Sequence, residues 1–174
     1  ITFFYPKLSV YGATLSGRAG EGVVSLEAAY YDSRQDGSGS DFTVPNSQTR
    51  LLMGYQIQPV EDLSLGLQYY AELMHDYAAY LAAQPAGFPV ETRWNHTLTF
   101  RATQMLMHQT LRLSLYASYN TSNGDYFINP ELRYSFTDRV WAAVGANVFG
   151  GKPRGQFGQL SRDDNMYLQV RYEF

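Results

Sequence analysis

The side chains most able to do chemistry in this sequence are arginines and glutamates that recur at alternate positions of otherwise apolar segments. Successive side chains of a β-strand point to opposite faces, so residues of one parity gather on one face of a sheet. A charged face of this kind can line a pore, and its excess of arginine favours anionic solutes. The expected pore-lining residues are Glu27, Arg50, Glu72, Arg101, Arg112, Glu131, Arg133 and Arg171.

Acidic and basic residues alternate between neighbouring segments, which predicts salt bridges across that face. The expected pairs are Glu27 with Arg50, Glu72 with Arg101, and Glu131 with Arg112. A second interpretation is that the same residues fill the interior and leave no path for solutes. An eight-stranded barrel is just wide enough to be filled by its own side chains.

Histidine and serine give no sign of a catalytic or metal site. The three histidines, His75, His96 and His108, show no metal-ligand spacing, and there is no cysteine. A serine hydrolase needs its serine and histidine on the same wall. Ser114 and Ser118 have inward parity, whereas His96 has outward parity and His108 lies in a turn. We therefore expect no enzyme activity, no metal and no cofactor.

Composition limits the class of protein. With 174 residues, the chain is long enough for a single domain, 1–174. Its net charge of −3 and lack of a basic run argue against nucleic acid as a partner. Mean hydropathy is −0.31, a value that barrel strands can produce because lipid-facing and lumen-facing residues cancel. The 15 Tyr against 2 Trp would suit the aromatic belts of a barrel.

Gly, Pro, Asn and Asp clusters divide the chain into nine segments of roughly ten residues, the length of a tilted membrane strand. In the first segment, Leu8 and Val10 have one parity and Ala13 and Leu15 the other, so we expect a bulge near Gly12. In the remaining segments the apolar and polar residues alternate. Only the Ala-rich stretch 76–83 has a helical period. The expected strands are about 5–16, 23–32, 48–57, 63–73, 94–103, 110–120, 126–136, 140–149 and 165–174.

The connections alternate between short and long. Short ones are expected at 17–22, 58–62, 105–109 and 137–139, and longer ones at 33–47, 76–93, 121–125 and 150–164. Bacterial barrels have tight periplasmic turns and longer extracellular loops. A soluble β-sandwich, the third interpretation, has no reason to keep such an alternation.

The last segment carries a family resemblance. Its apolar face ends on an aromatic residue, and the residues that form it are Met166, Leu168, Val170, Tyr172 and Phe174. This pattern resembles the terminal strand of Gram-negative outer-membrane proteins, in which Leu168, Val170, Tyr172 and Phe174 would be read by the barrel-assembly machinery. The stretches GANVFGG (145–151) and FGQLSRDDNMYLQVRYEF (157–174) resemble the ends of large porin-like or alginate-export-like barrels. The resemblance implies an outer-membrane location, with lipid and lipopolysaccharide as partners.

Aromatic and acidic residues near the strand ends fit this topology. Two aromatic girdles are expected, one of Tyr30, Tyr69, Trp94, Tyr119 and Tyr126, and the other of Tyr55, Tyr134, Phe136, Tyr172 and Phe174. Acidic loop residues could hold divalent cations, although solvated loop charge explains them as well. These residues are Asp32, Asp36, Asp41, Asp125, Asp163 and Asp164.

These patterns predict an all-β, antiparallel, up-and-down transmembrane β-barrel with about eight or nine strands present. Nine strands conflict with the even strand numbers of bacterial single-chain barrels. Either the chain is the C-terminal portion of a larger barrel, which we favour, or 1–16 is not a barrel strand and eight strands follow. The expected function is passage of small polar or anionic solutes. The alternative is a closed structural or adhesive barrel whose loops bind partners.

Overall fold

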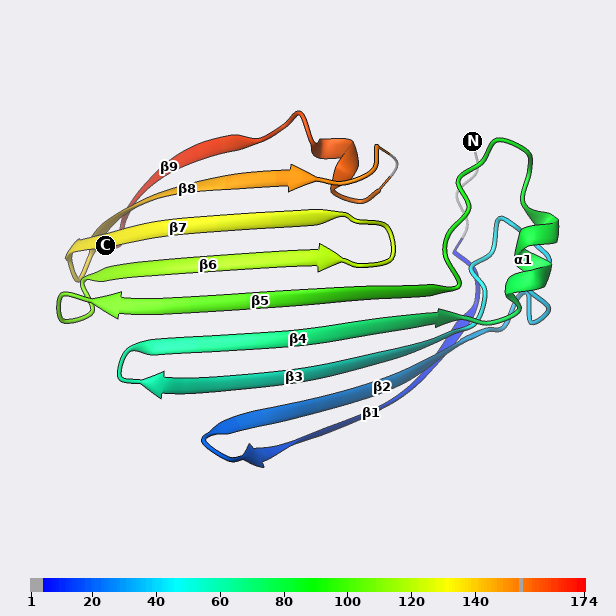
Figure 1. Ribbon diagram of the computed structural model, residues 1–174, viewed down its shortest axis with the longest axis horizontal. Helices are drawn as coiled ribbons and strands as arrows, with labels where there is room; N and C mark the ends of the chain where they lie inside the picture. The colour runs from blue at the N-terminus through cyan, green and yellow to red at the C-terminus, as the bar shows by residue number, and fades with distance from the viewer. Residues whose placement is uncertain (1–4, 154) are drawn as a thin grey trace.

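Nine strands, one short α-helix and one 3-10 turn make up the computed structural model, which describes residues 5–153 and 155–174. Each strand pairs antiparallel with its neighbours in sequence, and the order across the sheet is β1 to β9 without a crossover (Figure 1). The elements are β1 (Leu8–Ala19), β2 (Gly22–Ser33), β3 (Gln48–Val60), β4 (Leu63–Met74), α1 (Tyr77–Ala83), β5 (Trp94–Leu106), β6 (Leu111–Asn120), β7 (Tyr126–Thr137), β8 (Val140–Gly150), η1 (Gly158–Leu160) and β9 (Asn165–Tyr172).

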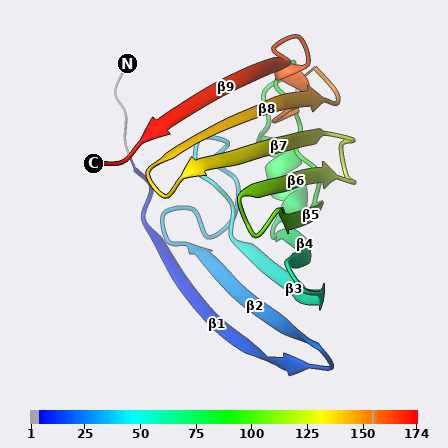
Figure 2. The same cartoon turned by 90° about the vertical axis from the view of Figure 1, so that its left-hand side faces the viewer.

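The predicted all-β, up-and-down topology is confirmed. The sheet curves into an open arc with β1 at one end and β9 at the other (Figure 2). In the described part of the chain these two edge strands do not pair with each other, so the sheet does not close into a barrel. The interpretation that excluded 1–16 from the sheet is wrong for the residues described, because Leu8–Ala19 forms β1. Residues 1–4 of that stretch lie outside the described chain.

The short connections lie at one end of the sheet and the long ones at the other, as predicted (Figure 1). The tight turns use left-handed backbone: Gly20 has φ 61° and Asp62 has φ 63°. Between β7 and β8, the Thr137 hydroxyl instead accepts the backbone N–H groups of Arg139 and Val140, at 3.2 and 3.0 Å. Such turns reverse the chain within a few residues and leave the strands in register.

The long connections are folded rather than open. In the β4–β5 connection, the Ala-rich stretch with a helical period forms α1, and a turn of 3-10 helix lies in the β8–β9 connection. In the β2–β3 loop the Asp36 carboxylate accepts the N–H groups of Ser38 and Asp41, at 3.2 and 2.6 Å, and the Ser38 hydroxyl at 2.7 Å. These loops lie at the same end of the strands (Figure 1).

None of the helices in the described chain is long and apolar enough to cross a membrane.

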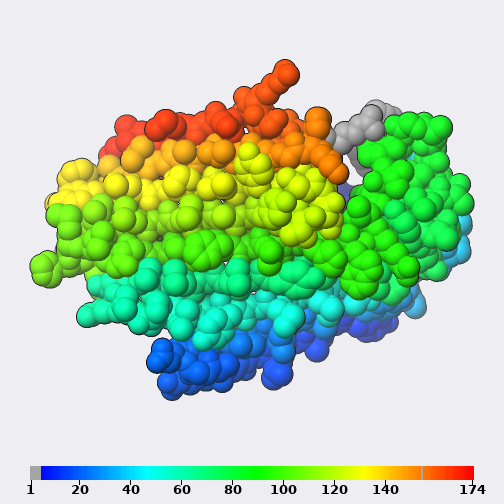
Figure 3. Space-filling view, viewed as in Figure 1, coloured from blue at the N-terminus to red at the C-terminus, as the bar shows by residue number. Residues whose placement is uncertain are grey.

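The register places the predicted apolar parity on the outer, convex face. One row runs Leu26, Met53, Tyr69, Leu98 and Tyr119, with each residue directly opposite the next. Within residues 5–153 and 155–174 no second layer covers this face, and in Figure 3 successive strands form consecutive bands across the surface. The solvent-accessible area is 11965 Å², against about 8,600 Å² for a globular monomer of this mass. The β-sandwich interpretation is therefore wrong for the described chain, because a sandwich buries one face of each sheet.

The bulge expected near Gly12 is absent. The β1–β2 register runs without interruption from Leu8 opposite Ser33 to Ala19 opposite Gly22. Leu8 and Val10 therefore lie on the inner face, whereas Ala13 and Leu15 lie on the outer one. Leu8 and Val10 remain about half exposed, so the apolar residues of β1 are divided between the two faces.

The β2–β3 loop provides a first testable prediction. The backbone N–H of Asp41, followed by the Ser38 side chain, lowers the pKa of Asp36 from its ordinary value of 3.8. A depressed pKa means that the carboxylate stabilises the loop above pH 3.8 and that this stabilisation is lost as pH falls through the folded pKa. The NMR shift of the Asp41 amide proton should therefore titrate with a midpoint below 3.8 and lose this step in Asp36→Asn. A midpoint at or above 3.8 would contradict the assignment.

Candidate functional site on the concave face

The concave face of the arc is polar, and its side chains form rows that cross several strands. One row runs Gln56, Gly66, Arg101, Tyr116 and Asn129, from β3 to β7. The two adjacent rows carry mainly Ser, Thr and Gln. All eight predicted pore-lining residues have the parity of this face, which we call the inner face.

Register decides which of the predicted salt bridges form. Arg112 pairs with Glu131 as expected, with Arg112 Nη2 2.9 Å from Glu131 Oε1. Arg50 pairs with Glu72, at 3.0 Å, because these two residues lie directly opposite each other. The expected pairs of Glu27 with Arg50 and of Glu72 with Arg101 are therefore wrong. Glu27 lies only diagonally from Arg50, which Glu72 holds from the directly opposite position. Gly66 lies opposite Arg101, six residues along β4 from Glu72.

The Glu131 carboxylate joins three strands. One oxygen accepts from Arg112 on β6, and the other accepts from the Tyr167 hydroxyl on β9 at 3.0 Å. Tyr167 reaches β7 by lying across Gly145 of β8, where an added Cβ would lie 2.4 Å from the tyrosine ring. A side chain at position 145 would therefore displace the Tyr167 ring from this position.

Two other arginines are also occupied. Arg133 lies over the Trp141 ring, with Cζ 3.9 Å from the ring centroid, a distance typical of a cation–π contact. Arg171 pairs with Glu173 at 3.2 Å, and both side chains are more than half exposed. Arg50 additionally lies 4.1 Å from the Tyr31 ring centroid and donates to Gln48 Oε1.

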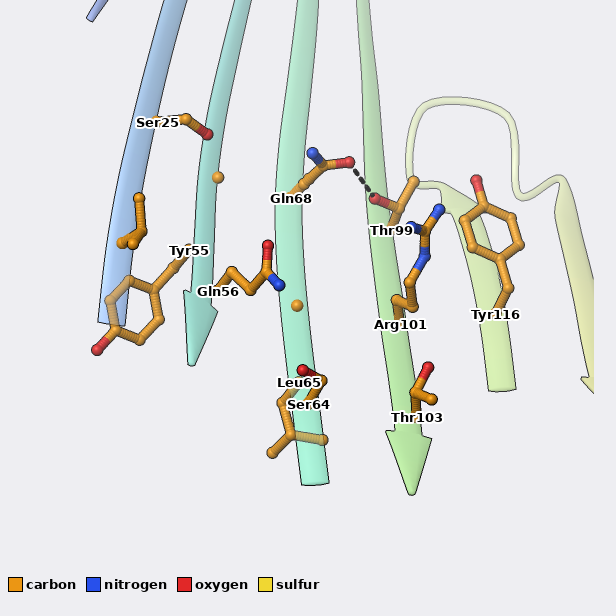
Figure 4. Close-up of a pocket in the computed structure, with 13 residues that line it drawn as sticks. Ser25, Tyr55, Gln56, Ser64, Leu65, Gln68, Thr99, Arg101, Thr103 and Tyr116 are labelled. Atoms are coloured by element: carbon orange, nitrogen blue, oxygen red, sulfur yellow. Dashed lines mark hydrogen bonds between the residues drawn. The ribbon is translucent and has the colours of Figure 1, made fainter. Parts of the chain in front are cut away.

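Arg101 differs from these four arginines. No ion pair to it forms within residues 5–153 and 155–174, and the nearest aromatic ring, Tyr116, has its centroid 5.9 Å from Arg101 Cζ. Its side chain lies in a depression of about 270 Å³, together with Gln56, Gln68 and Thr103 (Figure 4). Neither Asp nor Glu is among the thirteen residues that line the depression. We call this feature the Arg101 depression.

A larger cavity lies at the loop end of the inner face. It has a volume of about 730 Å³ and lies between the β2–β3 loop, α1 and the ends of β2 to β4. The Arg50–Glu72 pair forms part of its wall, and Tyr80 of α1 forms another part. A solute that moved along the inner face would meet this cavity and the Arg101 depression at different heights of the strands.

Sequence reasoning missed the aromatic and amide groups of the inner face. Tyr31, Tyr116, Trp141 and Tyr167 all contact predicted charges or a neighbour of one, as does Gln48. The signal was available, because each has the same parity as the arginines.

The histidines and serines lie as predicted. His96 is on the outer face, where it stacks between Trp94 and Tyr69, with ring centroids 5.6 and 5.8 Å away. Ser114 and Ser118 lie on the inner face, on the opposite side of the sheet. Within the described residues, no group of three or more His, Asp or Glu side chains could hold a metal ion.

The acidic loop residues are engaged individually. Asp32 pairs with Arg34 at 3.0 Å, and Asp164 accepts the Phe149 N–H at 2.8 Å. Asp125 is buried and accepts the Phe157 N–H at 3.3 Å, which holds the β8–β9 loop against the end of β7. Contacts within the loops or at strand ends therefore account for the positions of these three carboxylates.

The predicted terminal strand is present as β9, although it ends at Tyr172 rather than Phe174. Leu168, Val170 and Tyr172 lie on the outer face and are 77%, 68% and 60% exposed. Phe174 follows the strand, with its ring centroid 6.3 Å from that of Tyr172. Several of the expected girdle aromatics are exposed on the outer face near the two ends of the strands, among them Trp94, Tyr119, Tyr126, Phe136 and Tyr172.

Comparison with protein-family models, curated proteins and solved structures finds no match to this chain. The class that the fold defines is a single antiparallel up-and-down sheet, compatible with a β-barrel.

We expect the Arg112–Glu131 and Arg171–Glu173 ion pairs to contribute unequally to the free energy of unfolding. Glu131→Gln should lower the free energy of unfolding by about 1 kcal/mol, because it leaves Arg112, whose side chain is 35% exposed, without its carboxylate. Arg171→Gln should change it by roughly 0–0.3 kcal/mol, since the Arg171–Glu173 pair is exposed. Urea titration of both variants measures the difference. Equal losses would show that exposure does not set the strength of these pairs.

Proposed function

We propose that this chain forms part of a Gram-negative outer-membrane β-barrel through which small polar or anionic solutes pass passively. The observation that carries the proposal is the division of one uncovered sheet into an apolar convex face and a polar concave face. In an outer-membrane barrel the first face meets lipid and the second lines the lumen.

The outer face supports the lipid part of the proposal. Its exposed side chains include Leu51, Met53, Leu67 and Phe100, in the middle of their strands. Contiguous apolar surface of this extent is rare on soluble monomers. Its partners in the proposal are outer-membrane lipid and, near the loop end, lipopolysaccharide.

The inner face supports a lumen for solutes. The depression around Arg101 and the cavity near Arg50 leave space beside polar side chains. A closed adhesive barrel, the rival function, would need an interior filled by its own side chains. Hollows on the inner face favour the channel.

The open edges support a cylinder with more than nine strands. The described β1 and β9 each have one unpaired edge, and membrane-spanning sheets must pair all edges. In this proposal additional strands complete the cylinder, and the barrel-assembly machinery engages the β9 strand through Leu168, Val170, Tyr172 and Phe174. The length of the native gene product tests the first of these points.

Conductance tests the function itself. The complete protein, purified in detergent and added to planar bilayers in KCl, should give discrete channel events. A heat-denatured sample provides the control for detergent artefacts. No events at any salt concentration would contradict the channel and favour the adhesive barrel.

The assignment of faces can be tested on one strand. Leu113→Arg or Leu115→Arg would place a charge on the outer face of β6 and should weaken folding into lipid vesicles by about 2–4 kcal/mol. Ser114→Arg is the matched control, because Ser114 lies between them on the inner face. Urea titration of the folded fraction in vesicles measures the three variants. If Ser114→Arg were the damaging change, the two faces would be inverted.

A further inference from the structure

We infer that the Arg101 depression is a binding site for the carboxylate of a small organic anion, and that Arg101 is the arginine that sets anion selectivity. This inference rests on the proposed function and names the solute class and the residue responsible.

Charge is the first reason. Arg50, Arg112 and Arg171 each lie within 3.2 Å of a carboxylate oxygen, and Arg133 stacks on Trp141. An arginine that is paired to a carboxylate attracts a solute anion only weakly, because the two opposite charges largely cancel at a distance. Arg101 is exposed, and the lining of its depression contains no carboxylate.

Shape is the second reason. Gly66 lies directly opposite Arg101, and a Cβ added there would meet only Arg101 Cβ, at 4.0 Å. The missing side chain leaves the space beside the guanidinium open. The volume of about 270 Å³ exceeds that of a bare inorganic ion and admits a small organic molecule. Guanidinium presents two parallel N–H donors, which match the two oxygens of a carboxylate.

Neighbouring polar groups supply the third reason. The Thr99 hydroxyl donates to Gln68 Oε1 at 3.3 Å (Figure 4). This bond turns the acceptor of the Gln68 amide toward Thr99 and leaves its NH₂ group to donate elsewhere. Gln56, Ser64 and Thr103 line the same depression with neutral hydrogen-bonding groups. Hydroxyl groups on the organic part of the solute would find partners there, so a hydroxylated carboxylate such as lactate is a suitable probe.

The Arg50–Glu72 pair provides the design of the test. Those residues lie directly opposite each other on adjacent strands and form a salt bridge. Gly66 and Arg101 have the same relation, so Gly66→Glu should neutralise Arg101 in the same way. Gly66→Gln is the control, because glutamine has the shape of glutamate without its charge. Arg139→Gln removes a positive charge from the distant β7–β8 turn.

The experiment measures the anion-over-cation permeability ratio of the complete protein in planar bilayers under a KCl gradient. Arg101→Gln should lower the ratio roughly tenfold, because one unit charge about 6 Å from an ion changes the anion and cation terms by about threefold each, in opposite directions, at the dielectric constant of water. Gly66→Glu should fall below Gly66→Gln by a similar factor, and Arg139→Gln should match the wild type. Equal ratios for Gly66→Glu and Gly66→Gln, in protein that conducts, would overturn the inference and leave the channel standing.

A binding measurement separates the site from the channel. Line broadening of ¹³C-labelled lactate by the refolded protein should occur in the wild type and be lost in Arg101→Gln. Broadening that depends on Arg101 in a protein that does not conduct would support the site and refute the proposed function. Broadening that survives Arg101→Gln would overturn the inference. If inorganic phosphate bound at Arg101 and lactate showed no broadening, the carboxylate would be refuted as the ligand.

Discussion

Antiparallel hydrogen bonding between sequence neighbours is the constraint on which the rest of this structure depends. Each strand from β1 to β9 is hydrogen-bonded to the strands that precede and follow it in the sequence, so the whole sheet is one continuous ladder. Side chains then alternate between two faces along each strand, and directly opposite residues share a face. With no second layer, each face must be stable in whatever medium it meets.

The same ladder decides the electrostatics of the inner face. Charges of suitable parity are common there, but only those that are directly or diagonally opposite on neighbouring strands, or two residues apart on one strand, form ion pairs. Arg50 meets Glu72 because the β3–β4 register sets them opposite each other, and the bulge between Ile57 and Val60 lies beyond that point. Glycine also lets groups two strands apart meet. Glu131, Gly145 and Tyr167 lie directly opposite one another on β7, β8 and β9, and the Tyr167 side chain crosses Gly145 to reach Glu131.

Much of this could be predicted from the sequence, because a period of two is visible in single segments. The faces of β2 to β9, the alternation of connection lengths and the helix at Tyr77–Ala83 follow from local pattern and turn residues. Register could not be predicted, because it depends on turn geometry and on bulges that shift a strand by one residue. The error at Gly12 had another origin: a bulge was assumed so that all apolar residues of β1 would share a face, whereas Leu8 and Val10 lie on the inner one. The space beside Arg101 also could not be predicted from the sequence, because it depends on the register that places Gly66 opposite Arg101.

The uncovered face and the unpaired edges lead to the same requirement. A free edge exposes N–H and C=O groups that will pair with another strand, and an exposed apolar face adds a drive toward aggregation in water. Covering the face with a second layer would leave the edges unpaired, and pairing the edges alone would leave the face in water. Under the proposed function, closure into a cylinder surrounded by lipid would satisfy both. It would also place Arg101 and its polar neighbours around an enclosed aqueous path, where an arginine without a carboxylate partner has its greatest effect on which ions pass.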